Sequence, residues 1–141
     1  MAEQKRQERG VKVDRRVAEK LHLRFEIGAA KALLALDAKN VAALEMLGTA
    51  FTRSGRHDEA LDVDLKITEL SPKCAHAFYN LACSYSNLGH VDEGLGALQQ
   101  ALKLGYRDFN YMMTDEDLEN VRRDPRFRRM LDRRWGKRQR D

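Results

Sequence analysis

Apolar residues recur every three or four positions along most of the chain, the spacing that predicts amphipathic helices. One such run extends from Leu44 to Phe51 and ends near Gly55, because glycine readily adopts the left-handed conformation that closes a helix. A second run covers about residues 57–70 and stops before Pro72, which cannot continue a helix. The two runs and the short break between them predict a helical hairpin.

The same pattern returns after 34 residues, since Val41–Cys74 and Ala75–Asp108 align without a gap. A fixed period of this size indicates stacked supersecondary units. With only two prolines and no alternating strand pattern, we expect an all-α fold of stacked antiparallel hairpins. The two copies are identical at Ala43/Ala77, Leu47/Leu81, Gly55/Gly89, Asp58/Asp92, Glu59/Glu93, Leu61/Leu95 and Leu70/Leu104.

The segment before the repeats predicts one long helix with two apolar stripes. The first stripe contains Val17, Leu21, Gly28, Ala32 and Leu36, and the second contains Leu23, Ile27, Ala30 and Leu34. Since about three stacked units are the usual minimum for a stable array, we interpret residues 13–40 as a half repeat that caps the N-terminal end.

The segment after the repeats predicts two short capping helices. Thr114 to Asp117 offers a capping box for a helix through Val121, and Asp124-Pro125 offers an N-cap followed by proline for a second helix that carries Phe127 and Leu131. We therefore expect one domain over residues 13–134, with repeat units at 41–74 and 75–108 and capping helices at 109–134. Residues 1–12 are expected to form a disordered basic segment, and 135–141 a basic tail.

Composition adds little to this picture except for charge. The 141 residues are 43% hydrophobic, enough for one domain with a core, and neither a membrane span nor a secretion signal is recognisable, which favours a cytoplasmic location. Cys74 and Cys83 are expected to be reduced. The net charge of +4 is uneven, because residues 121–141 hold ten basic and three acidic side chains.

The repeated positions resemble the tetratricopeptide repeat, which also has a period of 34. The first unit reads Leu44-x2-Leu47-Gly48-x2-Phe51, then Ala60 and Pro72, and the second reads Phe78-x2-Leu81-Ala82-x2-Tyr85. The chain departs from the pattern at Asp64, Gly94 and Tyr106. Asp64 replaces a packing aromatic and predicts a weakened helix contact, and Gly94 weakens a helix interior by roughly 1 kcal/mol. The C-terminal end is similar to that of many small bacterial members.

The resemblance implies a right-handed superhelix whose concave groove binds a peptide or partner protein, without catalysis. In it, Tyr79 would pack against a peptide and Asn80 would bond its backbone; the alternative is a solvated face that touches nothing. The groove residues that the resemblance implies are Glu45, Met46, Thr49, Arg53, His76, Tyr79, Asn80, Cys83 and Asn87.

Other chemistry has weaker support. His76 and Cys83 are separated by about 10 Å of helix rise and lack a third ligand nearby in sequence, which disfavours a metal site. No cysteine–histidine pairing and no glycine-rich phosphate loop is apparent. We therefore expect no catalytic residues, metal or cofactor.

The basic C-terminal segment supports an alternative function, binding of nucleic acid or association with the ribosome. Against it, charge runs at termini are more often solvated, and this one lacks interleaved aromatic residues for base stacking. We expect a monomer or weak self-association through the open ends of the short stack. The basic patch would consist of Arg128, Arg129, Arg133, Arg134, Lys137 and Arg138.

Overall fold

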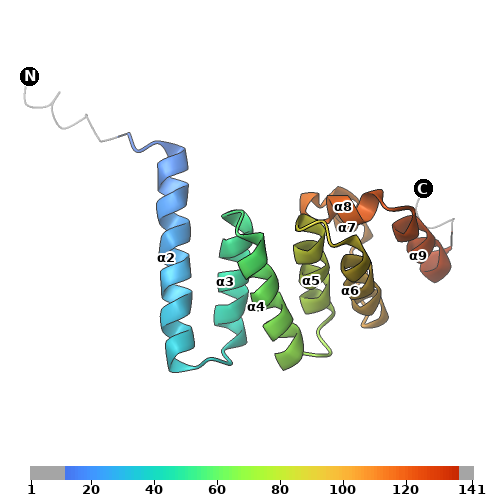
Figure 1. Cartoon of the computed structure of the whole chain (residues 1–141), viewed down its shortest axis with the longest axis horizontal. Helices are drawn as coiled ribbons and strands as arrows, with labels where there is room; N and C mark the ends of the chain where they lie inside the picture. The colour runs from blue at the N-terminus through green and yellow to red at the C-terminus, as the bar shows by residue number, and fades with distance from the viewer. Residues whose placement is uncertain (1–11, 137–141) are drawn as a thin grey trace, which may run out of the picture.

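The computed structural model describes residues 12–136, a range with helices and connecting turns but no strand. Most of the N-terminal segment that we expect to be disordered, residues 1–11, lies outside the described residues. So do Lys137 and Arg138 of the basic patch. The helices follow one another from α2 at one end to α9 at the other (Figure 1). They are α2 (Arg15–Leu36), α3 (Val41–Arg53), α4 (His57–Leu70), α5 (Ala75–Asn87), α6 (Val91–Lys103), α7 (Phe109–Thr114), the 3₁₀ helix η1 (Glu116–Leu118), α8 (Glu119–Arg123) and α9 (Pro125–Trp135).

The predicted all-α fold of stacked hairpins is confirmed, with α3–α4 and α5–α6 as the two repeat units. Their inner turns have the same geometry: Gly55 has a φ of 73° and Gly89 a φ of 75°. In the first turn the Arg56 N–H donates to the Phe51 carbonyl at 2.9 Å, and the bond at the equivalent positions of the second turn has the same length. The 34-residue period is therefore a period of backbone geometry as well as of sequence.

The N-terminal helix α2 begins at the side chain of Asp14, which accepts a hydrogen bond from the Arg16 N–H at 3.1 Å. Of its two apolar stripes, the one containing Leu23, Ile27 and Ala30 is buried, and α2 packs against α3. The other stripe is exposed. Within residues 12–136 no helix precedes α2, so among the described residues α2 corresponds to the second helix of a hairpin whose first helix is not described.

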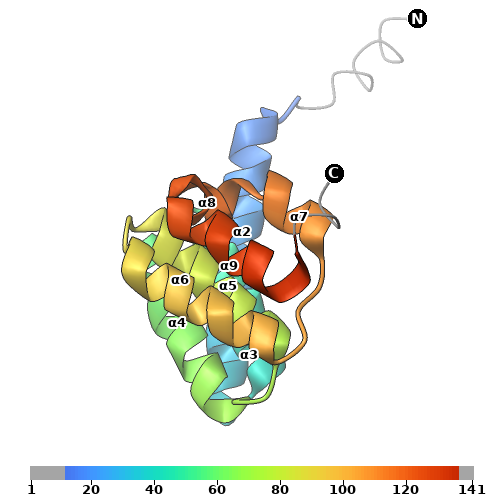
Figure 2. The same cartoon turned by 90° about the vertical axis from the view of Figure 1, so that its right-hand side faces the viewer.

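The C-terminal cap differs in detail from its prediction. Asp115, rather than Thr114, is the N-cap: its side chain accepts from the Asp117 N–H at 3.0 Å, while the Thr114 hydroxyl donates back to a carbonyl of α7. The helix expected there begins as η1 and continues as α8, and the preceding helix α7 was not predicted. At α9 the cap is as predicted, since Asp124 accepts from the Arg126 N–H at 2.9 Å. In the end-on view, α9 lies across the end of the stack (Figure 2).

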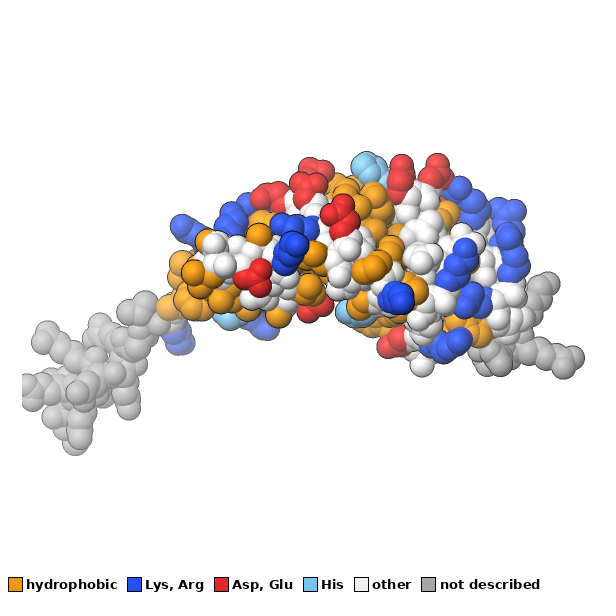
Figure 3. Space-filling model, turned by 90° about the horizontal axis from the view of Figure 1, so that it is seen from below, with side chains coloured by type: hydrophobic (Ala, Val, Ile, Leu, Met, Phe, Trp, Pro, Cys, Tyr) orange, Lys and Arg blue, Asp and Glu red, His pale blue; other side chains and the backbone are white. Residues whose placement is uncertain are grey.

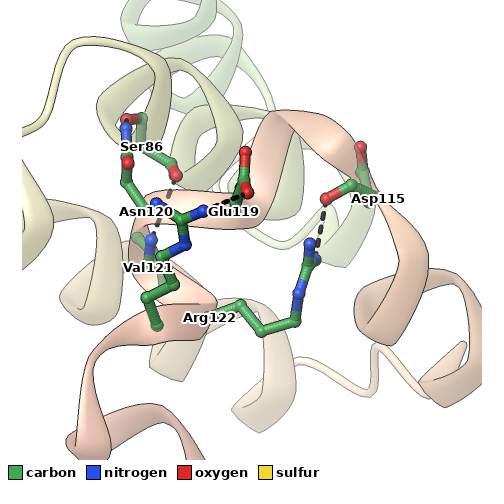
Figure 4. Close-up of polar contacts among 7 residues, drawn as sticks. Ser86, Asp115, Glu119, Asn120, Val121 and Arg122 are labelled. Atoms are coloured by element: carbon green, nitrogen blue, oxygen red, sulfur yellow. Dashed lines mark hydrogen bonds and ion pairs between the residues drawn. The ribbon is translucent and has the colours of Figure 1, made fainter.

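Gly94 lies where α8 comes closest to α6. A Cβ atom at this position would lie 2.7 Å from the Cγ2 of Val121 and 3.4 Å from the carbonyl oxygen of Ala82. Val121 is fully buried, and its N–H donates to the Ser86 hydroxyl at 3.2 Å (Figure 4). Gly94 weakens α6, but because it has no side chain, α8 can pack closely against α6 and Val121 can be buried in the core.

Two hydrophobic clusters fill the stack, which we call the N-terminal core and the C-terminal core. The N-terminal core lies among α2, α3, α4 and the start of α5, and the C-terminal core lies among α5 to α9. Buried members of the N-terminal core are Leu23, Ile27, Ala30, Leu44, Leu47, Ala50, Phe51, Ala60, Val63, Ile67 and Ala77. Those of the C-terminal core are Tyr79, Leu81, Ala82, Cys83, Leu95, Ala97, Leu98, Ala101, Leu102, Met112, Leu118, Val121, Phe127 and Leu131.

The junction between the cores corrects the prediction about Asp64. Instead of leaving a weak contact, Asp64 is only 7% exposed and accepts a hydrogen bond from the Ser84 hydroxyl at 2.6 Å. Its other oxygen lies beside Gly48, where an added Cβ would be 3.3 Å away. A buried polar pair therefore joins α4 to α5 at the place where family members use an aromatic ring.

Candidate functional site

The candidate site is a groove between α3 and α5 with a cavity of about 260 Å³. Residues of α4 and of the segment from Tyr111 to Asp117 complete its wall. Two of the nine predicted residues do not line it: Met46 is 40% exposed elsewhere on α3, and the Asn87 amide donates to Asp117 Oδ1 at 3.2 Å. The predicted residues that the structure brings together are Glu45, Thr49, Arg53, His76, Tyr79, Asn80 and Cys83.

Tyr79 lines the groove, but its ring is covered and does not face a ligand as the resemblance implied. The side chain is 1% exposed, and its hydroxyl donates to Asp115 Oδ2 at 2.7 Å. Its ring stacks on Tyr106 with the ring centroids 4.2 Å apart and the planes inclined by 3°. Tyr79 therefore belongs to the C-terminal core, and replacing it would damage the fold as well as the groove.

Asp115 organises the closed end of the groove. It is 8% exposed, and besides the Tyr79 hydroxyl its Oδ2 accepts from the Cys83 thiol, with Sγ 3.7 Å away. Burial is the main reason that the pKa of the Cys83 thiol is raised well above its ordinary value, and the charge of Asp115 adds to the effect. A thiol held in its protonated form is a weak nucleophile, so Cys83 acts here as a buried packing residue.

Carboxylates dominate the charge of the groove. Asp64 is the most perturbed of them, because burial raises the pKa of its carboxyl group to about 6, an effect opposed by the Ser84 hydrogen bond. Arg53, one of the two basic residues, is turned toward α2, with its guanidinium 3.5 Å from Glu19. At neutral pH the groove is therefore acidic and attracts cationic groups. The charged lining consists of Glu45, Asp64, Asp115 and Asp117 against Arg53 and His76.

Sequence reasoning missed eight of the residues that line the groove: Gly48, Thr52, Asp64, Ile67, Ser84, Tyr111, Asp115 and Asp117. Asp64 was visible as a departure from the family pattern, but nothing in the period indicated that it would be buried beside Ser84. The last three lie beyond the repeats, where no periodic partner places them. The sequence indicated Asp115 only as part of a helix-capping segment, and Asp115 does cap η1 in the structure.

Arg122 and Asn120 fix the segment that closes the groove. The Arg122 guanidinium donates to the carbonyl oxygens of Met112 at 3.0 Å and Asp115 at 2.7 Å, and so ties α7 to the start of η1. The Asn120 amide donates to the Ser86 carbonyl at 2.8 Å. Figure 4 shows the Arg122 side chain reaching along the segment toward Asp115. Arg122, a cation of the basic C-terminal segment in the sequence, is thus a structural residue.

The predicted basic patch is divided between different sides of α9. Arg133 and Arg134 line a cleft of about 460 Å³ between α6 and α9. Arg128 lines a separate cavity of about 200 Å³ beside α7, and Arg129 is exposed. Lysine and arginine side chains gather over the α9 end of the molecule (Figure 3). The cations form a charged end of the molecule rather than one site.

Other site chemistry is sparse in the part of the chain that the structure describes. Among residues 12–136, no group of three or more His, Cys, Asp or Glu side chains is placed to hold a metal ion. Cys74 and Cys83 are both free thiols. None of the described helices combines the length and the apolar character that crossing a membrane requires.

Comparisons with known proteins agree with the helical hairpins. Tetratricopeptide repeat families match residues 27–73 and 75–104. The chain is also similar to a protein of Arabidopsis thaliana whose name describes it as chloroplastic, with 39% identity over 87 residues. The similar region covers 60% of this chain and 26% of that protein, so the chain spans about a quarter of the relative's length.

Proposed function

Because the chain belongs to the tetratricopeptide repeat family, we propose that it is a non-catalytic scaffold that binds a peptide or a segment of a partner protein between α3 and α5. The observation that carries this proposal is the open cavity of about 260 Å³ bounded by the first helices of both hairpins. Its lining is not the same in the two copies, because Tyr79 and Cys83 of α5, which stand at the repeat positions of exposed Glu45 and Thr49 of α3, are buried. A surface that keeps its scaffold and varies its lining is suited to recognition.

The lining favours a ligand that carries a basic side chain. Four carboxylates reach the cavity, and the α5 half is covered at Tyr79. The accessible contacts include Glu45 and Thr49 of α3 and His76 and Asn80 of α5. An amide such as that of Asn80 both donates and accepts, which suits the backbone of an extended peptide. A lysine or arginine of that peptide would then face Glu45 and the carboxylates behind it.

Affinity capture from the native cell, followed by mass spectrometry, tests this proposal. The variant is Glu45→Lys combined with Asn80→Ala, which leaves the buried Tyr79 intact. The matched control is Glu69→Lys, the same charge reversal at an exposed position of α4 outside the groove. We expect partners of the wild type to be retained by the control and lost by the double variant. Equal capture by all three proteins, with equal helicity by circular dichroism, would show that the groove is not the site.

The alternative, binding of RNA or DNA by the basic C-terminal segment, stays a prediction. No aromatic ring lines the cleft that holds Arg133 and Arg134, so base stacking is not provided there. Deleting the whole segment is a poor test because Phe127 and Leu131 are buried. Arg133→Glu with Arg134→Glu tests it instead, since phosphate binding would weaken in this variant and fall steeply with salt.

The cellular setting is also a prediction. We expect a cytoplasmic protein from a bacterium, as the sequence suggests, whereas the similar Arabidopsis protein is named as chloroplastic. Fractionation of the native cell followed by immunodetection checks the location.

A further inference from the structure

Most of the exposed apolar surface belongs to one helix. Ten large apolar side chains are exposed among the described residues, and six of them lie on α2 or just before it. Phe25 is 74% exposed and Leu36 88%. Exposed apolar side chains concentrated on one helix are the kind of surface that marks an interaction site on a folded protein. The six residues are Val13, Val17, Leu21, Phe25, Leu33 and Leu36.

These side chains form a ridge suited to helix packing. Apolar residues follow one another at every fourth position from Val13 through Phe25 to Leu33, the i, i+4 row that packs into the groove of another helix. Beside the ridge, Gly28 and Ala32 form a row of small residues. The ridge lies away from the stripe of α2 that is buried, so α2 can contact α3 and another helix at once.

The internal repeat shows that part of this face is normally covered. In α4, Val63 and Ile67 are buried in the N-terminal core, at 8% and 4% exposure. Thirty-four positions earlier, the equivalent residues of α2 are Ala29, which is half-buried, and Leu33, which is 42% exposed. The difference arises because α4 has a first helix before it and α2, in the described chain, has none. α2 therefore presents a face that a complete hairpin would bury.

Gly28 is a second indication that another helix packs against the exposed face of α2. Glycine weakens a helix interior relative to alanine, so it needs a compensating reason in the middle of a 22-residue helix. At Gly48 and Gly94 that reason is close packing, since an added Cβ would lie 3.3 Å and 2.7 Å from neighbouring atoms. At Gly28, as at Gly96 of α6, an added Cβ would meet nothing within 4 Å. Close approach of a second helix that is not among the described residues would give this glycine the same purpose.

We propose that α2 is a homodimer interface, in which the α2 helices of two copies pair antiparallel across a two-fold axis near Phe25 and Gly28. The reason to choose a second copy is that α2 complements itself when reversed. Its N-terminal half carries bulky Leu21 and Phe25, its C-terminal half carries Gly28 and Ala32, and a two-fold contact sets each half against the other.

The contact between the α2 helices of the two copies is small. A 22-residue helix is about 33 Å long, and interdigitating i, i+4 rows cross at about 50°, so the two α2 helices touch over only part of that length. Such a contact is small for a specific interface, so we expect a weak dimer that forms at micromolar concentrations. The antiparallel arrangement also brings exposed Arg24 of one copy near exposed Lys31 of the other. Since these charges repel, salt strengthens the dimer rather than weakening it.

Sedimentation velocity of the full chain, from low to high micromolar concentration and in low and high salt, tests the proposal. The wild type is expected to dimerise as concentration rises and to remain dimeric in high salt. Phe25→Glu should raise the dissociation constant at least about tenfold. The matched control is Leu65→Glu, which changes an apolar residue exposed to 37% on α4 and should leave dimerisation unchanged.

Gly28→Ala separates association from folding. Alanine favours the helix, so the thermal midpoint should stay the same or rise, while the two added methyl groups at the axis weaken the dimer several-fold. Circular dichroism checks that every variant keeps its helicity. A wild type that is monomeric at high micromolar concentration would overturn the proposal. So would a dimer that persists in Phe25→Glu or dissociates in high salt.

Discussion

The two cores of this protein use the same repeat but end differently. At the C-terminal core, α7 to α9 fold back over the last hairpin, and Met112, Leu118 and Val121 have no exposed surface. At the N-terminal core, α2 buries one stripe and leaves the other in solvent. A hairpin with one apolar face to spare needs a covering element, and residues 12–136 supply one at the C-terminal end only. The apolar side chains at the two ends of the stack therefore contribute differently to stability according to what covers them.

Truncation of one leucine in each region should give the largest contrast. Leu118→Ala removes a fully buried side chain and leaves a cavity, so the free energy of unfolding should fall by about 2 to 5 kcal/mol. Leu21→Ala, at a site with 56% exposure, should change it by less than about 0.5 kcal/mol. Urea unfolding followed by circular dichroism, at a concentration low enough to keep the protein monomeric, measures both. Equal losses would contradict the contrast between a closed and an open end.

The junction between the cores should respond to pH. Burial raises the pKa of Asp64 to about 6 from an ordinary value of 3.8, so the folded state binds this proton more tightly than the unfolded state. The resulting stability is fully present below about pH 4 and is lost as pH rises through about 6. Asp64→Asn keeps an acceptor for Ser84 without the charge, so it should be the more stable protein at pH 7, by about 1 to 3 kcal/mol.

Urea unfolding from pH 4 to pH 7 measures this difference. The advantage of Asp64→Asn over the wild type should grow as pH rises. Asp62→Asn, at an exposed position of the same helix, is the matched control and should follow the wild type. A difference between Asp64→Asn and the wild type that does not vary with pH would mean that Asp64 does not ionise in the folded protein as its burial implies.

The repeats could be predicted from the sequence because each hairpin depends on local signals that occur twice. The apolar spacing and the glycines Gly55 and Gly89 act within a few residues of where they stand, and so does Pro72, which occurs in the first unit only. The long α2 helix and the proline start of α9 were predictable for the same reason. Such features require no knowledge of which segments meet in space.

The covered part of the groove could not be predicted in this way. The burial of Tyr79 depends on Tyr106 and Asp115, which lie 27 and 36 positions later in the chain, outside the α5–α6 hairpin. A helix face looks the same in sequence whether solvent or a returning segment covers it. Gly94 illustrates the same limit, because its purpose is visible only once Val121 is in place. The C-terminal segment that contains α7 and η1 covers part of the groove through tertiary contacts. These contacts have no counterpart in the first repeat, so the period of the sequence does not reveal them.

Two arginines, one at each end of the stack, should differ in how much they contribute to the free energy of unfolding. Arg122 is half-buried and donates to two carbonyl oxygens of the closing segment, so Arg122→Ala should cost about 1 to 2 kcal/mol by leaving those acceptors without this donor. Arg53 joins α2 to α3 through ion pairs of 3.5 Å and 3.9 Å between exposed or partly exposed side chains, so Arg53→Ala should cost less than about 0.5 kcal/mol. High salt should reduce the Arg53 effect and leave the Arg122 effect nearly unchanged, because exposed charges are screened more than buried ones.

Urea unfolding of both variants in low and high salt makes the measurement. A larger loss for Arg53→Ala would mean that polar contacts between α2 and α3, rather than the covering element at the other end, hold the stack together.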